Sequence, residues 1–320
     1  MEHELTWGLP VILYLFLAGV GSGAVTVSAS VLLRGGGGGF GGDHFSMARY
    51  GAIIGPFPVM IGTSLIVLEL GRPDRAFNLF KVVNLSPMNI GSWLLLLFMA
   101  TSVLYALTFL PSFFASLKHL SRRLDLVRRI LAFVNVPLGI GVAVYTGVML
   151  GAMPSRPLWN SPILALLFLV SALSTGVAMI ILARVLFHRK SANAEARHKF
   201  HESAYLLTAS DALLIGTELM VIFLFVLFAH LTIGNVKYAV SVILPGGELA
   251  PLFWLWVVLI GLLLPVLAEL VFVIPKLLFH RGYSAPGTIE VAIAIAVLTG
   301  GFMLRYVIVV GGQITGPMGL

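Results

Sequence analysis

The chain has 320 residues, of which 59% are hydrophobic and only 10% are charged, with a formal net charge of +7. Soluble domains carry about 25% charged residues, so this composition excludes an ordinary soluble protein and indicates a chain that lies in a lipid bilayer. The basic residues fall in short loops between apolar runs, which argues for membrane topology and against nucleic-acid binding. Because cysteine is absent, the chain holds no cysteine-ligated iron–sulfur cluster of its own.

The apolar runs are long enough to cross about 30 Å of hydrocarbon as helices, and they lack the alternation typical of barrel strands. In chain order they predict eight spans, at about 8–33, 47–70, 91–110, 129–151, 161–187, 203–233, 250–278 and 287–310. The connecting loops are too short for a soluble domain. We therefore predict an all-α integral membrane protein in which residues 1–320 form one membrane domain, an eight-helix bundle.

The loops after the first, third, fifth and seventh spans hold most of the 20 Lys and Arg residues. Such loops face the cytoplasm in membrane proteins. The opposite side has only Arg72, Arg75, Lys81, Arg156, Lys237 and, inside the last span, Arg305. Both termini are therefore predicted to lie on the non-cytoplasmic side, here called the outer side.

The stretch LELGRPDRAFNLF, residues 68–80, follows the second span on the side that otherwise avoids positive charge. Its charged residues Arg72, Asp74 and Arg75 come directly after Glu69. One interpretation is a network of ion pairs at the helix end. The other is a surface that docks a partner or borders a ligand site.

Ionisable residues inside spans are costly and often mark sites or pathways. Four acids fall in the cytoplasmic half or near the middle of the predicted bundle: Asp211, Glu218, Glu269 and Glu290. A ladder of carboxylates reaching towards the outer side is what a proton pathway requires. The alternative is that each acid pairs locally with a backbone or hydroxyl group.

A second polar group is predicted nearer the outer side. Counting about 1.5 Å per residue from the span ends puts Tyr14, Tyr145 and Arg305 at one depth, with Glu69 just above them. Three spans that supply polar side chains at one depth suggest a pocket that opens near the outer face. His230 is the one histidine well inside a span, which argues against bound haem because haem b in a helical bundle usually needs axial histidines from the spans.

Five segments in this order resemble the NrfD family, which includes the polysulfide reductase membrane subunit. They are WGLPVILYLFLAGVGSGA (7–24), LELGRPDRAFNLF (68–80), SPMNIGSW (86–93), YTGVMLGAMPSRPLWNSPILALLFLVSALSTG (145–176) and FMLRYVIVVGGQ (302–313). The resemblance implies an eight-helix subunit without haem or an iron–sulfur cluster. It also implies that Tyr145 matches the family's tyrosine that contacts a quinone carbonyl. Some relatives add a histidine or asparagine from the first span, and residues 7–33 contain neither.

The resemblance further implies a respiratory role in the cytoplasmic membrane of a bacterium or archaeon, surrounded by membrane lipid. The subunit would exchange electrons between menaquinone or ubiquinone and a ferredoxin-like, four-cluster iron–sulfur subunit on the outer face. That partner would serve a catalytic subunit, either a molybdopterin enzyme or a multihaem cytochrome. Tyr145, Tyr14, Arg305 and Glu69 are then expected to bind quinone, and Arg72, Asp74 and Arg75 to dock the partner.

Two rival functions are compatible with the same residues. A secondary transporter would use broken helices and buried carboxylates, although its site would lie near the middle of the membrane. A purely structural anchor would leave the acids inside the spans without a purpose. The substrate of the respiratory complex would react on the catalytic subunit, so we assign no residue of this chain to that reaction.

Overall fold

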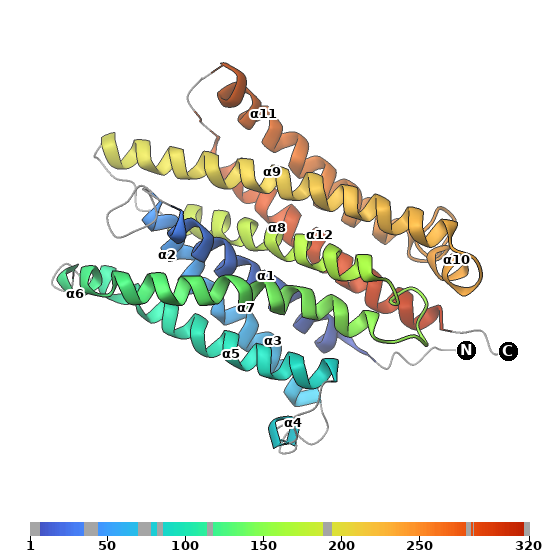
Figure 1. The fold of residues 1–320 in the computed structure, drawn as a ribbon. Helices are drawn as coiled ribbons and strands as arrows, with labels where there is room; N and C mark the ends of the chain where they lie inside the picture. The colour runs from blue at the N-terminus through green and yellow to red at the C-terminus, as the bar shows by residue number, and fades with distance from the viewer. Residues whose placement is uncertain are drawn as a thin grey trace.

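The computed structural model describes residues 7–34, 44–69, 78–81, 86–113, 118–187, 194–279, 283 and 285–316. Every regular element in these ranges is helical (Figure 1). The long helices are α1 (Leu9–Leu33), α2 (Phe45–Ile54), α3 (Pro56–Glu69), α5 (Pro87–Leu107), α7 (Asp125–Gly151), α8 (Pro162–Phe187), α9 (Ala194–Leu231), α11 (Leu264–Phe279) and α12 (Gly287–Ile314). The short ones are α4 (Asn78–Lys81), η2 (Leu110–Phe113), α6 (Lys118–Arg123) and α10 (Asn235–Val240), and a π-helix, η4 (Leu252–Leu263), precedes α11.

Within the described residues, 8 helical segments are long and apolar enough to cross a membrane, which confirms the predicted spans. Their boundaries agree with the sequence pattern to within about four residues because apolar runs and helix-start signals coincide. At α5, for example, Ser86 caps the helix by accepting a hydrogen bond from the Asn89 backbone N–H at 3.3 Å, and Pro87 follows. The second span is two helices, since α2 stops at Gly55 before Pro56 starts α3.

The start of α1 and the end of α12 lie at the same end of the bundle. The Gln313 side chain forms two hydrogen bonds with the backbone of Trp7. Its Oε1 accepts from the Trp7 N–H at 2.8 Å, and its Nε2 donates to the Trp7 carbonyl at 3.1 Å. Trp7 also stacks on Trp159, with ring centroids 5.2 Å apart. We call this the Trp7 end, and the opposite end, which holds Arg128 and Arg184, the Arg184 end.

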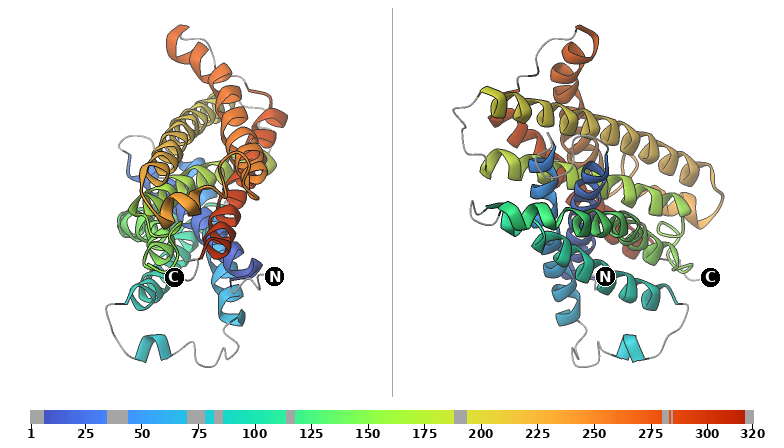
Figure 2. Two further views of the ribbon diagram at one scale, coloured as in Figure 1. Left: turned by 90° about the vertical axis from the view of Figure 1, so that its right-hand side faces the viewer. Right: turned by 60° about the vertical axis from the view of Figure 1, so that its left-hand side comes forward.

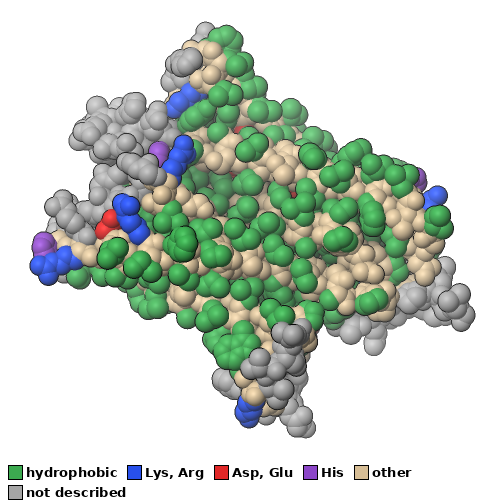
Figure 3. Space-filling view, in the orientation of Figure 1, with side chains coloured by type: hydrophobic (Ala, Val, Ile, Leu, Met, Phe, Trp, Pro, Cys, Tyr) green, Lys and Arg blue, Asp and Glu red, His purple; other side chains and the backbone are tan. Residues whose placement is uncertain are grey.

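Helices α1, α8 and α12 form the centre of the bundle. Within an apolar stretch of 18 residues in each span, 78%, 67% and 61% of the residues are buried in these three helices. In the other five spans the buried share is 33–44%. The outer helices expose leucine, isoleucine and phenylalanine, and the face in Figure 3 is largely hydrophobic with Lys and Arg at its edges. An apolar surface of this extent fits contact with lipid.

Glycine allows α1 and α8 to approach closely. A Cβ on Gly23 would overlap the backbone carbonyl of Ala172, and one on Gly176 would overlap the backbone of Gly23. Small residues have this effect in membrane bundles, where dispersion contacts between backbones replace the hydrophobic effect. The two most buried helices are therefore in backbone contact.

The seventh span changes its helical geometry partway. The Leu264 N–H bonds to the Leu259 carbonyl, five residues back, which is the π pattern. Pro265 has no N–H to donate, and the α pattern resumes there. Beyond it, the later part of α11 stands away from the bundle (Figure 2), and its last residues, Leu277 to Phe279, are exposed.

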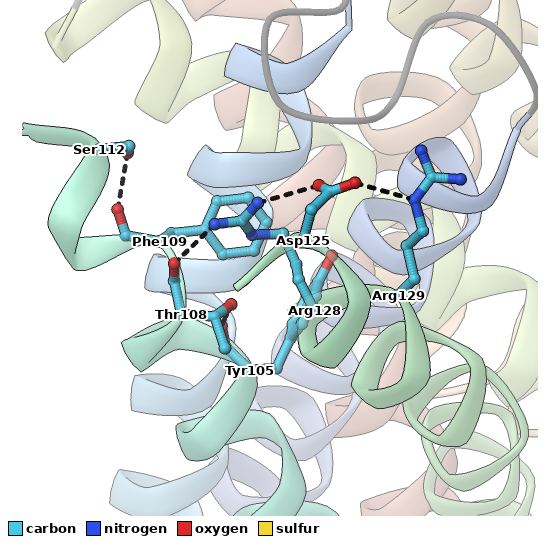
Figure 4. Close-up of polar contacts among 7 residues, drawn as sticks. All are labelled: Tyr105, Thr108, Phe109, Ser112, Asp125, Arg128 and Arg129. Atoms are coloured by element: carbon cyan, nitrogen blue, oxygen red, sulfur yellow. Dashed lines mark hydrogen bonds and ion pairs between the residues drawn. The ribbon is translucent and has the colours of Figure 1, made fainter. Parts of the chain in front are cut away.

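A buried arginine fastens three helices at the Arg184 end (Figure 4). Arg128 on α7 donates to the Thr108 carbonyl at 2.7 Å and to Asp125 at 3.1 Å. Its guanidinium lies 4.7 Å from the ring centroid of Phe109 and 5.2 Å from that of Phe45. These contacts link α7 to the ends of α5 and α2.

Gly23→Ala tests the close approach of α1 and α8. The new methyl group would overlap the Ala172 carbonyl, and overpacking of this kind costs about 1–3 kcal/mol. We expect a lower unfolding temperature in detergent. Gly216→Ala is the matched control, because Gly216 lies within α9 with nothing within 4 Å of its Cβ position. Equal stability of both variants would contradict the contact.

Candidate functional site

Two tyrosines lie buried towards the Trp7 end. Tyr14 on α1 is 2% exposed and Tyr145 on α7 is 8% exposed, and they are close enough to interact electrostatically. The Tyr145 ring packs directly on Gly91 of α5, where any Cβ would overlap it. The absence of a side chain at Gly91 is therefore what makes room for the ring.

The Tyr145 hydroxyl has a weak partner. Its hydrogen bond goes to the Met149 sulfur, one turn further along α7, at 3.5 Å. A thioether is a poor acceptor, so this O–H can give a stronger bond to a carbonyl oxygen. We call Tyr14, Tyr145, Gly91 and Met149 the tyrosine site.

Glu69, at the end of α3, is exposed beside the start of α1. Its Oε1 lies 3.6 Å from the position that a Cβ on Gly8 would take. The other charged residues predicted on this stretch, Arg72, Asp74 and Arg75, lie outside the described residues.

Arg305 is 1% exposed and bonds neutral oxygens of the protein. Its Nη1 donates to the Ser171 hydroxyl at 2.5 Å and to the Gly301 carbonyl at 2.9 Å. Glu218 on α9 lies close enough to interact with Ser171 and with the Arg305 charge. Ser171 of α8, Arg305 of α12 and Glu218 of α9 thus form one polar group, and no hydrogen bond among the described residues joins Arg305 to Tyr14 or Tyr145.

Deeper in the bundle, two carboxyl groups face each other. Asp211 on α9 accepts a hydrogen bond from the Ser174 hydroxyl at 3.0 Å. It also lies within hydrogen-bonding reach of Glu269 on α11, and both acids are 0% exposed. Neither oxygen of Glu269 receives a bond from an N–H or hydroxyl group of the described residues, so a bond between the two acids needs a proton on one of them. We call Asp211 and Glu269 the acid pair.

At the Arg184 end, Glu290 sits in an ion pair. Arg184 Nη2 lies 2.6 Å from Glu290 Oε2, and both side chains are almost fully buried. The Tyr283 hydroxyl donates to Glu290 Oε1 at 3.1 Å and lies 2.9 Å from the Thr208 hydroxyl. Burial raises the pKa of Tyr283 above its ordinary value, so its hydroxyl keeps its proton at neutral pH.

A small cavity separates this ion pair from the acid pair. Its polar lining comes from Thr208, Glu269, Tyr283 and Glu290. The space open to the centre of a water molecule is about 10 Å³, close to the ~10–15 Å³ that holds one water. The four acids predicted as a ladder therefore lie close to one another among α8, α9, α11 and α12: the cavity lies between Glu290 and Glu269, and Asp211 contacts Glu269 and interacts with Glu218. We call these acids and the polar side chains beside them the polar chain: Arg184, Glu290, Tyr283, Thr208, Glu269, Asp211, Ser174, Glu218, Ser171 and Arg305.

The sequence singles out the acids and Arg305 as ionisable residues inside spans, but it does not identify their hydrogen-bond partners. Ser171 and Ser174 lie three residues apart and so share one face of a helix. That spacing in an apolar span was a usable signal. Arg184 was counted only as a loop cation, and Tyr283 gives no sequence signal because its role depends on how a loop folds back onto α9 and α12.

An open hollow lies at the Trp7 end, beside the end of α12. The turn between α10 and η4, including Ser241, Gly246 and Glu248, lines it together with Tyr238 and Thr315. Its volume is about 670 Å³. In the described part of the sequence, no group of three or more His, Asp or Glu side chains could hold a metal ion.

These features define a multi-pass integral membrane protein with a buried polar chain and a tyrosine site. The family model of polysulphide reductase, NrfD, matches residues 1–317. The chain therefore belongs to the NrfD family, as the sequence predicted.

Relatives match along nearly the whole length of the protein. A polysulfide reductase polypeptide of Wolinella succinogenes is 30% identical over 97% of this chain and 95% of its own length. Protein NrfD of Escherichia coli is 30% identical over 98% and 96%. A selenate reductase subunit of Mesobacillus selenatarsenatis is 24% identical over 82% of this chain and 66% of its own length.

Arg184→Met tests the buried ion pair. Removing one partner leaves the Glu290 charge uncompensated in a buried place, which costs about 3–5 kcal/mol. The double variant Arg184→Met/Glu290→Met should be more stable than Arg184→Met, because no charge is stranded. Thermal unfolding in detergent measures both.

Arg129→Met is the control for this prediction. Arg129 pairs with Asp125 at 3.1 Å, but its side chain is 53% exposed, and exposed pairs are worth about 0–1 kcal/mol. If Arg184→Met were as stable as Arg129→Met, the buried ion pair would contribute nothing to the stability of the protein.

Proposed function

We propose that this chain is the quinone-reactive membrane subunit of a respiratory oxidoreductase complex. It exchanges electrons between menaquinone or ubiquinone and an iron–sulfur partner on the outer side of a bacterial or archaeal cytoplasmic membrane. The observation that carries the proposal is the tyrosine site, with its weakly bonded hydroxyl, in a protein similar along its length to the polysulfide reductase polypeptide of Wolinella succinogenes. The name of the selenate reductase relative supports the same class.

The residues of the tyrosine site fit a quinone head group. Among the residues that the structure describes, the Tyr145 hydroxyl bonds only the Met149 thioether, at 3.5 Å, and a quinone carbonyl is a better acceptor for it. Met149 and the neighbouring apolar side chains suit an isoprenoid tail. The second carbonyl has no histidine or asparagine available from α1, so Tyr14 or Arg305 is proposed to take that role.

Bound quinone supplies the two-electron, two-proton chemistry. Tyr145 holds one quinone oxygen and fixes its orientation. Glu69, exposed near the start of α1, accepts or delivers protons at the rim. Arg305 contributes positive charge to the same region of the bundle, although its direct bonds go to Ser171 and Gly301.

The partner is proposed to dock at the Trp7 end. Arg72, Asp74 and Arg75 supply charges beside Glu69, and such charges at an interface fix orientation more than affinity. The hollow lined by the turn before η4 lies at the same end of the bundle. The partner is a ferredoxin-like protein with four clusters, and through it a molybdopterin enzyme or multihaem cytochrome is connected.

The polar chain is proposed to move protons between the tyrosine site and the Arg184 end. Hydrogen bonds join Ser174 to Asp211 and Arg305 to Ser171, and the cavity beside Glu269 has room for a water. Buried acids without ionic partners are costly in a membrane, which favours a functional reason for the acid pair.

Tyr145→Phe tests the quinone site in a complex purified gently through a tag on this subunit. Loss of one hydrogen bond costs about 1 kcal/mol, so quinone affinity should fall about fivefold. The iron–sulfur partner should still co-purify, because Tyr145 is buried. Mass spectrometry of proteins and extracted lipids measures both.

Tyr105→Phe is the matched control, since Tyr105 is a buried tyrosine near the opposite end of α5 and bonds Ser28. Equal quinone content in both variants would remove Tyr145 from the site. A wild-type subunit that purifies alone and without quinone, by a method that preserves known complexes, would favour a secondary transporter instead.

Glu218→Gln tests proton transfer. Glutamine keeps the size and polarity of the side chain but cannot pass a proton on, so membrane potential formed by the complex in vesicles should fall while quinone turnover continues. Thr217→Val is the control, because Thr217 is the exposed neighbour of Glu218 on α9 and its hydroxyl bonds the Leu213 carbonyl of its own helix. Membrane potential equal to wild type at equal turnover would exclude a necessary role for Glu218.

A further inference from the structure

The acid pair contains buried oxygens that receive no hydrogen bond from the described residues. Glu269 is 0% exposed, and both its oxygens lack a bond from any N–H or hydroxyl group of the described residues. Buried polar atoms in proteins nearly always have a partner, and ordered water is a common one. Something other than these side chains must therefore satisfy at least one Glu269 oxygen.

The cavity beside Glu269 can supply that partner. It has room for about one water, and the Thr208 and Tyr283 hydroxyls and the Glu290 carboxylate lie around it. A water there finds the two to four polar partners that a buried water needs. Ala285 also lines the cavity and is itself only partly buried, so the cavity lies just inside the surface of the Arg184 end.

The arrangement of the bundle explains why the cavity is here. Helix α11 leans away from α12 beyond Pro265, and its end protrudes from the bundle (Figures 1 and 2), while Lys276 in its last turn still contacts the Tyr205 ring of α9. Phe272 on α11 and Ile293 on α12 form the apolar walls of the cavity. Two helices that diverge leave a space that side chains of this size fill only partly.

Glu290 is differently placed although it lines the same cavity. One of its oxygens is 2.6 Å from Arg184 and the other accepts from Tyr283 at 3.1 Å. Because both oxygens of Glu290 already have partners, this side chain is suited to hold Tyr283 in place and to orient water in the cavity.

We propose that this cavity is the water entrance through which protons reach the acid pair, with Glu269 as the first acceptor and Glu290 as the side chain that holds Tyr283 and orients the water. A proton passes from cavity water to a Glu269 oxygen, and that water regains a proton from bulk water at the Arg184 end; no electron moves. Tyr283 acts as a positioning residue, because its hydroxyl ties the loop before α12 to Thr208 and Glu290. The inference deepens the proton-transfer part of the proposed function and rests on it for its biological role.

The test uses water itself as the probe, on the purified full-length protein. Infrared spectroscopy detects the C=O stretch of protonated carboxyl groups, and the band of Glu269 is assigned by its loss in Glu269→Gln. Transfer into D₂O shifts that band as the proton exchanges. We expect the Glu269 band to be present and to exchange rapidly, and Glu290→Gln to leave it in place.

Two variants change the cavity in opposite directions. Ala285→Phe fills it, so exchange should be at least about tenfold slower because it then needs a local opening of the bundle. Phe272→Leu enlarges it and should speed exchange. Ala152→Phe, at the exposed end of α7 on the Trp7 end, is the matched control and should exchange like wild type.

Three results would overturn the inference: no band that depends on Glu269, loss of the band in Glu290→Gln, or equal exchange in Ala285→Phe and wild type. The measurement needs neither quinone nor partner. If the exchange results hold while Glu218→Gln leaves membrane potential unchanged, the entrance exists and the proposed proton transfer fails. If exchange fails while Glu218→Gln abolishes the potential, protons enter by another path.

Discussion

The cost of placing charge in a low-dielectric interior governs this molecule. Hydrocarbon offers no water to charged groups, so each one in a span must be neutralised by a proton or bonded within the protein. Arg128, Arg184 and Arg305 show the second solution, since each is 2% exposed or less and bonded to groups from another helix. Their bonds determine which helices must be neighbours, and the glycine contacts between α1 and α8 allow the helices to come close enough.

The three arginines do different work because their partners differ. Arg128 donates to the Thr108 carbonyl at the end of α5 and to Asp125 on its own helix, and its guanidinium lies against two aromatic rings. These contacts give it a structural role. Arg184 forms a tight ion pair that fixes Glu290. Arg305 bonds the neutral oxygens of Ser171 and Gly301, and the acid near enough to interact with its charge is Glu218.

The polar chain and the tyrosine site lie on different helices yet share the centre of the bundle. The tyrosine site uses α1, α5 and α7, whereas the polar chain uses α8, α9, α11 and α12. Helix α1 meets both, because Gly19 packs near Arg305 and Tyr14 lies five residues earlier. In the proposed function, α1 therefore connects the proposed quinone site with the proposed proton path.

The sequence by itself determined the eight candidate spans and the family, and it singled out the acids inside the spans. Apolar length and flanking charge are local properties that a lipid bilayer selects directly, so span boundaries could be read to within a few residues. It did not determine which polar groups meet. Depth counting put Arg305 level with the tyrosines, and the fold shows that it bonds Ser171; the sequence left local pairing of Glu290 open, and the fold pairs it with Arg184. Such contacts depend on the rotation of each helix and on the divergence of α11 after Pro265, which only the packing of all the helices sets.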